Sequence, residues 1–174
     1  MPRKVNTDSL EQEEIVGHEN DRLFLVVVDN SEELGGTIKY TCNRARHTGG
    51  KMALLYVIDM EHDKEFQHWQ FVSNLMEEEA MQLAQDVLDH HARQILRDSG
   101  SEPMQFIRLG NTREELFALV RKHPEISILV LGSAPGEKPG PLVEAVTGKY
   151  AGQLGIPVTI VPGELSSEEI NRLT

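Results

Sequence analysis

Short runs of consecutive apolar residues alternate with stretches of helical periodicity along this chain. Three of the runs are Leu23–Val28, Met52–Ile58 and Ile126–Leu131. A strand that is apolar on both faces is typical of a parallel sheet covered by helices on both sides. The third run stops abruptly at Gly132 and Ser133, before another helical pattern. A buried strand that ends in a glycine turn before a helix is where α/β proteins hold small ligands, so the pattern predicts both an α/β fold and a place for its site.

Two further segments complete the predicted sheet. Met104–Leu109 is the third predicted strand, and Pro157–Val161 is the fifth. The fifth begins at a proline and contains Thr159, which suits a strand at the edge of a sheet. Five strands that alternate with helices require right-handed crossovers and one mostly parallel sheet.

Apolar residues at helical spacing predict helices at Glu32–His47, Val72–Asp98, Thr112–His123 and Leu142–Leu154. The second is the longest. Its predicted apolar face consists of Met76, Ala80, Leu83, Ala84, Val87, Leu88, His91 and Ile95.

Capping patterns mark where the helices begin. Asn30 or Ser31 is the predicted N-cap of the first helix. Thr112 and Ser166 are each followed three residues later by a glutamate, which predicts a cap at Thr112 and a short C-terminal helix or tail after Ser166.

The chain divides into three predicted regions. Residues 1–21 are polar and lack apolar periodicity, so we expect a flexible N-terminal arm. Residues 22–163 carry all five strands and form the predicted domain, and residues 164–174 form the C-terminal tail or short helix.

Composition argues against several kinds of partner. Asp and Glu total 28 against 17 Lys and Arg, a formal net charge of −11, which repels the phosphates of nucleic acids. No apolar run approaches the roughly 20 residues of a membrane helix, so we expect no membrane partner. Cys42 is the sole cysteine, which fits a reducing cytoplasm, and its helical position predicts a core residue rather than a nucleophile.

Polar residues follow the first and fourth predicted strands. Asp29 comes directly after the first strand, and Gly132 ends the fourth. Ligands of open parallel sheets bind beyond the strand carboxyl ends, where the strand order reverses. If the first and fourth strands are neighbours there, Asp29 and Gly132 face the same crevice. Two roles for Asp29 stay open, a turn residue or a carboxylate that binds a ligand.

The segment 59–71 interrupts the pattern and contains His62, His68 and Trp69 among several acidic residues. The histidine spacing matches no recognised metal-ligand pattern, so we expect no metal site. Its aromatic residues favour packing over a sheet edge or against a partner.

Four stretches together resemble the universal stress protein family. They are VVVDNSEE, LLYVID, LGNTREEL and ILVLGS…GIPVTIV, which span about residues 23–161 in the family's order and spacing. The resemblance implies an open five-stranded parallel sheet of order 3-2-1-4-5 with helices on both faces, a Rossmann-like (adenine nucleotide alpha hydrolase-like) fold. It also implies a homodimer through the fifth strand, at residues 158–161. The segment EFQHW and the extended second helix resemble a bacterial single-domain branch.

Members of that family that bind ATP carry the pattern G-x2-G-x9-G-(S/T). Their first-strand aspartate and a valine of the second strand contact adenine and ribose. Asp29 and Val57 match those positions, with Asn30 and Ser31 as neighbouring candidates, and Gly132 and Ser133 match the start of the phosphate loop. The resemblance therefore implies ATP or another adenine nucleotide as the candidate cofactor.

The phosphate half of the pattern departs from the family. The second glycine is displaced to Gly136, and the final Gly-Ser pair falls on Glu144 and Ala145. A carboxylate about 5 Å from a phosphate charge costs roughly 3 kcal/mol at an effective dielectric near 20. A missing hydroxyl donor costs about 1 kcal/mol more. Both substitutions favour a site that no longer binds a nucleotide cofactor.

Catalytic motifs are absent from the sequence, which has neither G-x-S-x-G nor H-E-x-x-H. The sequence therefore predicts a cytoplasmic, homodimeric stress-response or regulatory module with a degenerate nucleotide site, no catalytic residues and an unidentified protein partner. The alternative is an ATP-binding switch with a rearranged phosphate loop and slow ATPase activity. A metal-dependent enzyme at the histidine-rich segment is the third and weakest hypothesis.

Overall fold

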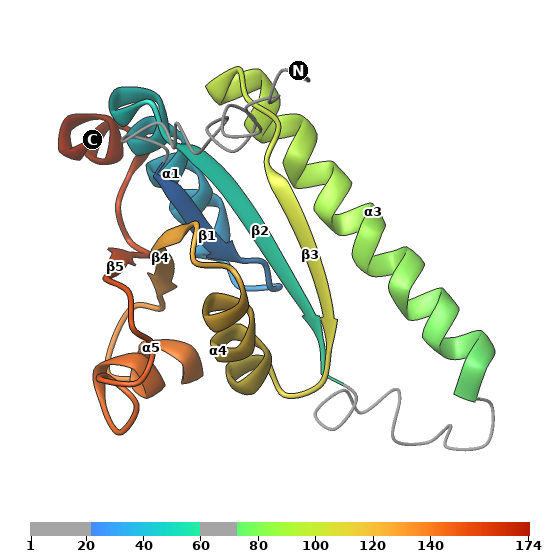
Figure 1. Ribbon diagram of the computed structural model, residues 1–174. Coiled ribbons are helices and arrows are strands. Elements are labelled where there is room, and N and C mark those ends of the chain that lie inside the picture. The colour runs from blue at the N-terminus through green and yellow to red at the C-terminus, as the bar shows by residue number, and fades with distance from the viewer. Residues whose placement is uncertain (1–21, 60–72) are drawn as a thin grey trace, which may run out of the picture.

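Five parallel strands form one sheet in the order β3-β2-β1-β4-β5 in this computed structural model (Figure 1). The structure describes residues 22–59 and 73–174. The predicted arm and most of the predicted insertion, with His62, His68 and Trp69, lie outside these residues. The elements are β1 (Leu23–Val27), α1 (Leu34–Thr48), β2 (Lys51–Ile58), α3 (Ser73–Ser99), β3 (Met104–Leu109), α4 (Thr112–Lys122), β4 (Ile126–Ser133), α5 (Pro141–Thr147), β5 (Val158–Pro162) and α6 (Ser167–Leu173).

The predicted fold class and strand order are confirmed. All four strand pairs are parallel, and β1 pairs with both β2 and β4. The five residues of β1 are all buried, which is why its sequence is apolar on both faces. β5 forms one edge of the sheet, as its proline and threonine predict, and β3 forms the other.

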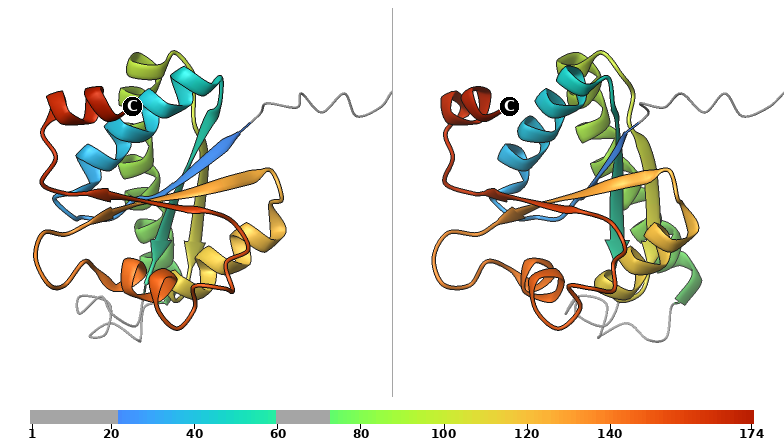
Figure 2. Two further views of the ribbon diagram at one scale, coloured as in Figure 1. Left: turned by 90° about the vertical axis from the view of Figure 1, so that its left-hand side faces the viewer. Right: turned by 60° about the vertical axis from the view of Figure 1, so that its left-hand side comes forward.

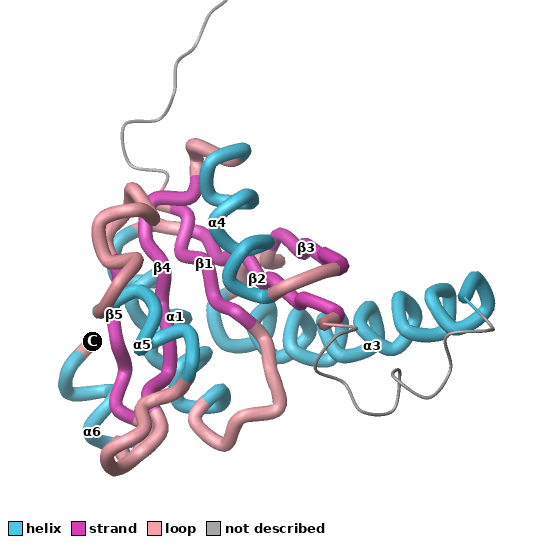
Figure 3. Tube along the Cα trace, turned by 90° about the horizontal axis from the view of Figure 1, so that it is seen from below, coloured by secondary structure: helices cyan, strands magenta, loops and turns pink. Residues whose placement is uncertain are grey.

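Helices cover both faces of the sheet. One apolar core joins the sheet to α4 and α5 through Leu116, Leu119 and Val143. The other joins the opposite face to α1 and α3 through Ile38 and Leu88 among others. Figure 2 shows α6 lying beside α1, and Figure 3 shows α3 running past the β3 edge of the sheet.

The start of α1 differs from the prediction. The helix begins at Leu34, and its N-cap is Glu33, which makes no side-chain cap bond. Neither Asn30 nor Ser31 caps it; both lie in a turn before the helix, in which the Ser31 backbone N–H donates to Asp29 Oδ1 at 3.0 Å. This Asx-type turn continues the loop and delays the helix.

One residue of the predicted apolar face of α3 is also placed differently. Ala80, Ala84, Leu88 and Ile95 are buried, as predicted. Leu83 is 65% exposed, because the N-terminal half of α3 extends beyond the sheet and only a narrow stripe of small residues packs there.

Two other helix boundaries need correction. The N-cap of α4 is Asn111 rather than Thr112, since Asn111 has extended backbone angles and its side chain accepts from the Glu114 N–H. α5 ends at Thr147, before the predicted end at Leu154, and turns follow from Gly148. Leu154 still packs in the core without being helical, which explains the misleading periodicity. The capping box at Ser166 is confirmed.

Candidate functional site

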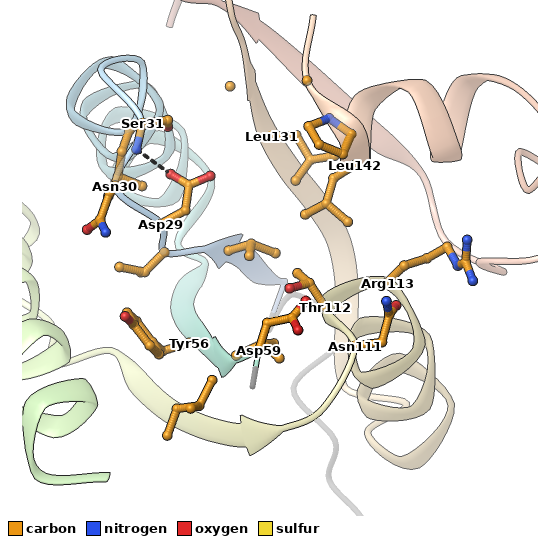
Figure 4. A pocket seen from close by; sticks show the side chains of 18 of the residues that line it. Asp29, Asn30, Ser31, Tyr56, Asp59, Asn111, Thr112, Arg113, Leu131 and Leu142 are labelled. Carbon is orange, nitrogen blue, oxygen red and sulfur yellow. Dashed lines mark hydrogen bonds between the residues drawn. The ribbon is translucent and has the colours of Figure 1, made fainter. Parts of the chain in front are cut away.

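A cavity of about 1100 Å³ opens at the carboxyl ends of β1, β2 and β4 (Figure 4). Its other walls come from the first turns of α1, α4 and α5 and from the N-terminal half of α3. The strand order reverses between β1 and β4, so the cavity lies where open α/β sheets bind ligands. The prediction that Asp29 and Gly132 face one crevice is confirmed, since both line it.

The structure brings six of the nine predicted site residues to this cavity: Asp29, Asn30, Ser31, Val57, Gly132 and Ala145. The other three, Ser133, Gly136 and Glu144, do not line it. Glu144 is on the exposed side of α5, because the helix begins at Pro141 and turns that position outward.

Asp29 serves the turn and also faces the cavity. One carboxylate oxygen accepts the Ser31 N–H, and Figure 4 shows the second oxygen turned toward the cavity. The two roles left open by the sequence are therefore compatible, since one oxygen serves the turn and the other is directed at the space where a ligand would lie.

Gly132 has a packing reason to lack a side chain. A Cβ atom built there would lie 2.5 Å from Thr37 Oγ1 and 2.7 Å from Glu33 Cγ. Thr37 is itself buried, and its hydroxyl donates to the Glu33 carbonyl at 2.9 Å. The glycine therefore allows β4 to lie against the first turn of α1, with the aliphatic part of the Glu33 side chain beside it.

The loop between β4 and α5 closes on itself. The Ala134 N–H donates to the Pro139 carbonyl at 3.1 Å. Gly136 and Gly140 have φ values of 90° and 113°, which other residues rarely adopt. Pro141 begins α5 and has no N–H to offer a ligand. A helix of seven residues also adds only a small dipole, so this end is a poor phosphate cradle.

The charged lining of the cavity is mainly acidic. Asp29, Glu33, Asp59 and Glu79 contribute carboxylates, and Arg113 contributes the one guanidinium among the lining residues that the structure describes. Arg113 lies over the ring of Tyr150, 4.4 Å from its centroid, and its Nη2 is 3.6 Å from Glu114 Oε1. Figure 4 shows its side chain extending away from the centre of the cavity. The guanidinium therefore lies at the rim of the cavity and does not face its centre.

Sequence reasoning missed several lining residues. Asp59 directly follows β2 as Asp29 follows β1, so its position was a usable signal. Glu33, Glu79 and the exposed Leu83 carried no such signal, because only the packing of α1 and α3 brings them to the cavity.

The described part of the chain gives no support for a reactive cysteine or for a metal centre. The prediction that Cys42 is a core residue is confirmed: its thiol is buried and lies 3.5 Å from the Met52 sulfur. Burial raises the pKa of the Cys42 thiol to about 11, which keeps it unreactive. Within residues 22–59 and 73–174, no group of three His, Cys, Asp or Glu residues could hold a metal ion.

The model of the universal stress protein family matches residues 22–162. The chain belongs to the universal stress protein family. Its matched region contains all five strands and ends before α6. A search among curated proteins gave no significant match. In the described residues of this universal stress protein, no helix is both long enough and apolar enough to span a membrane.

Solved structures share the fold at low sequence identity. The universal stress protein UspA from Lactobacillus plantarum is 22% identical, with 80% of this chain and 97% of that chain covered and a TM-score of 0.64. A family member from Burkholderia pseudomallei is 17% identical, with coverage of 83% and 98% and a TM-score of 0.60. A universal stress protein solved in complex with cAMP is 11% identical, with coverage of 83% and 99% and a TM-score of 0.55.

Proposed function

We propose that this universal stress protein is a non-catalytic regulatory module of the stress response whose cavity does not bind ATP tightly. The observation that carries the proposal is the position of Glu33. The aliphatic part of its side chain packs against Gly132, the first glycine of the family's phosphate pattern, and Glu33 is one of the four carboxylate residues that line the cavity. A triphosphate would have to approach this carboxylate with no free guanidinium among the described lining residues to offset it.

The electrostatic cost supports the same conclusion. A phosphate charge about 5 Å from one carboxylate is repelled by roughly 3 kcal/mol at an effective dielectric near 20. A difference of about 1.4 kcal/mol changes an affinity tenfold, so even one such contact is a large penalty. In this proposal the source of the repulsion is Glu33, whereas Glu144, which the sequence pattern suggested, lies outside the cavity lining.

The adenine and ribose half of the cavity is better preserved. Asp29 and Val57 both line the cavity, at the positions that match the family's nucleoside contacts. The relative in complex with cAMP supports a small adenine-containing ligand in this fold. We therefore propose that the cavity accepts a nucleoside-like ligand without a phosphate chain.

Titration calorimetry with Mg-ATP tests this proposal. We expect no heat of binding at micromolar nucleotide for the native protein. Binding with a Kd of a few micromolar would contradict it and would establish the alternative, an ATP-binding switch. Hydrolysis assays on the same sample then separate a passive switch from a slow ATPase.

We further propose that the protein is a homodimer that pairs through the free edge of β5. This edge carries the exposed Ile160, and an unpaired strand edge tends to associate. Sedimentation velocity should show a dimer that Ile160→Lys converts to monomer. Met104→Lys, at an exposed residue of the opposite edge strand β3, is the matched control and should leave the dimer intact. A native monomer, or a dimer lost only with Met104→Lys, would contradict the proposal.

The proposed setting is the cytoplasm, which suits a chain whose sole cysteine is a buried thiol. With a net charge of −11, we expect the partner of the dimer to be a protein rather than a nucleic acid or a membrane surface.

A further inference from the structure

We infer that the groove between α3 and the free edge of β3 binds an extended segment of a partner protein, which adds to the sheet beside β3 and carries basic side chains. The groove has a volume of about 560 Å³ and is lined by Glu77, Glu78, Met81, Gln82, Gln85 and Ile107. None of these residues lines the cavity at the carboxyl ends of the strands. The inference therefore goes beyond the proposed function and does not depend on what that cavity binds.

The backbone of β3 offers a free edge to a further strand. β3 pairs with β2 on one side, and no described strand lies on its other side. The Gly110 N–H donates to the Ile58 carbonyl at 3.0 Å, so the backbone groups of every second residue before Gly110 face β2. The backbone groups of Gln105, Ile107 and Leu109 therefore face outward. An outward row of N–H and C=O groups is the template with which an extended peptide pairs.

A neighbouring side chain covers the outward carbonyl of Ile107. Arg108 Nη1 donates to it at 3.3 Å, and the same guanidinium lies 5.9 Å from the centroid of the Phe106 ring. This bond is longer than the roughly 2.9–3.0 Å that is usual for an N–H donor, so a backbone N–H of a guest strand can replace it. The edge of β3 is therefore protected but not closed to a further strand.

The helix α3 supplies the side chains that a guest strand would meet, since it lies alongside β3 (Figure 1). Gln85 Nε2 donates to Gln105 Oε1 at 2.8 Å, which ties the helix to the edge strand. Met81 is 40% exposed and shares the groove lining with Ile107. Leu109, two residues further along β3 and on the same face as Ile107, is also exposed. The groove therefore suits an apolar side chain of a guest strand.

Charge complementarity selects the occupant. Residues 73–92 of α3 contain neither lysine nor arginine, and their carboxylates are those of Glu77, Glu78, Glu79, Asp86 and Asp89. Glu77 and Glu78 are exposed and line the groove. A second copy of this chain would bring its own net charge of −11 to the groove, and an anionic membrane surface would also be repelled. A strand that carries lysine or arginine on either side of an apolar residue complements both the carboxylates and the apolar lining.

A defined peptide tests the inference on the full chain. The probe is a fluorescein-labelled heptapeptide with threonine at its odd positions, lysine at positions two and six, and valine at position four, so that the lysines and the valine share one face of a strand. Fluorescence anisotropy at low salt should show saturable binding, at least tenfold tighter than that of the same peptide with glutamate in place of both lysines. Raising the salt concentration should narrow this ratio.

Methylation of the peptide backbone separates strand pairing from charge attraction alone. Alternate N–H groups of a strand face opposite sides, so only one alternating set can donate to the outward carbonyls of β3. N-methyl groups on that set should lower the affinity at least tenfold, and N-methyl groups on the other set should lower it less than threefold. Equal losses from the two sets would overturn the pairing with β3.

Protein variants assign the binding to the groove. Glu77→Gln combined with Glu78→Gln should weaken the binding of the lysine peptide at least threefold at low salt. Glu144→Gln combined with Glu168→Gln removes the same charge from exposed residues of α5 and α6, and this matched control should leave the affinity unchanged. Arg108→Ala removes the guanidinium from the outward carbonyl of β3 and should strengthen binding at least twofold.

Two further outcomes would overturn the inference. One is the absence of saturable binding of the lysine peptide at millimolar concentration, or an affinity that the two pairs of glutamate variants lower equally. The other is a protein that still dimerises after Ile160→Lys and loses the dimer with Met81→Lys, which would place a second copy of the chain in the groove.

Discussion

The β1–β2 side of the cavity and the β4–α5 side match the family pattern to different degrees. On the first side, Asp29 and Val57 lie at the expected positions and line the cavity. On the second side, only Gly132 and Ala145 of the expected residues line it, and Gly136 and Glu144 do not. A ligand would therefore meet the proposed nucleoside contacts on one side and a closed, proline-containing loop on the other.

This difference shows that a glycine at a position of the family's phosphate pattern is not evidence that the family's ligand binds there. Gly132 fits the family's phosphate pattern, but its missing side chain is required by contact with Thr37 and Glu33. A glycine that packing requires stays in place whether or not a phosphate binds beside it, so it gives no information about the ligand. The charges that line the cavity and the geometry of the β4–α5 loop indicate more directly which ligand binds.

Of the substitutions that follow, we expect the one at Gly132 to have the largest effect on stability. Gly132→Ala should lower the free energy of unfolding by about 1–3 kcal/mol without any ligand, because the new methyl overlaps Thr37 and Glu33. Gly35→Ala is the matched control in α1, since nothing lies within 4 Å of its added methyl, and it should stabilise the protein by about 0.5–1 kcal/mol. Urea unfolding measures both.

If Gly132→Ala unfolds at the same urea concentration as the native protein and only its nucleotide affinity falls, Gly132 is needed for a ligand rather than for packing. The proposed difference between the β1–β2 and β4–α5 sides of the cavity would then be wrong.

A smaller effect is expected at the start of α4, which also lines the cavity. Asn111→Ala should cost about 1 kcal/mol of stability, because it removes the side chain that accepts the Glu114 N–H. Thr112→Ala, at the neighbouring residue, should cost clearly less. Thermal unfolding of the two variants distinguishes the observed cap from the one that the sequence predicted. Equal losses of stability in the two variants would contradict Asn111 as the cap.

The smallest effect concerns Glu144 and Ala145. The double variant Glu144→Gly, Ala145→Ser restores the family's Gly-Ser pair, and the sequence pattern alone predicts that it strengthens ATP binding. We expect a gain of no more than about fivefold in calorimetry, because Glu144 is exposed and outside the cavity lining, so only the hydroxyl added at Ala145, worth about 1 kcal/mol, reaches the cavity. A gain of tenfold or more would show that the phosphate half is intact apart from these two residues.

The sequence predicts the sheet well because β1, β2 and β4 are buried on both faces, which leaves a continuous apolar run at each strand. It also predicts the shared crevice of Asp29 and Gly132, since that follows from strand order. The sequence does not predict the cap at Asn111 or the early end of α5, because several neighbouring residues are equally suited to be the cap or the last helical residue. The contact between Glu33 and Gly132 joins residues far apart in sequence, and no local pattern reports it.

We propose above all that this cavity does not bind a triphosphate, and the most direct test is the small-molecule content of the purified protein. Native protein is purified without added nucleotide and heat-denatured, and the released molecules are identified and quantified by mass spectrometry. We expect no ATP or ADP above the level released by an unrelated protein purified in parallel. Stoichiometric ATP in the released fraction would contradict it.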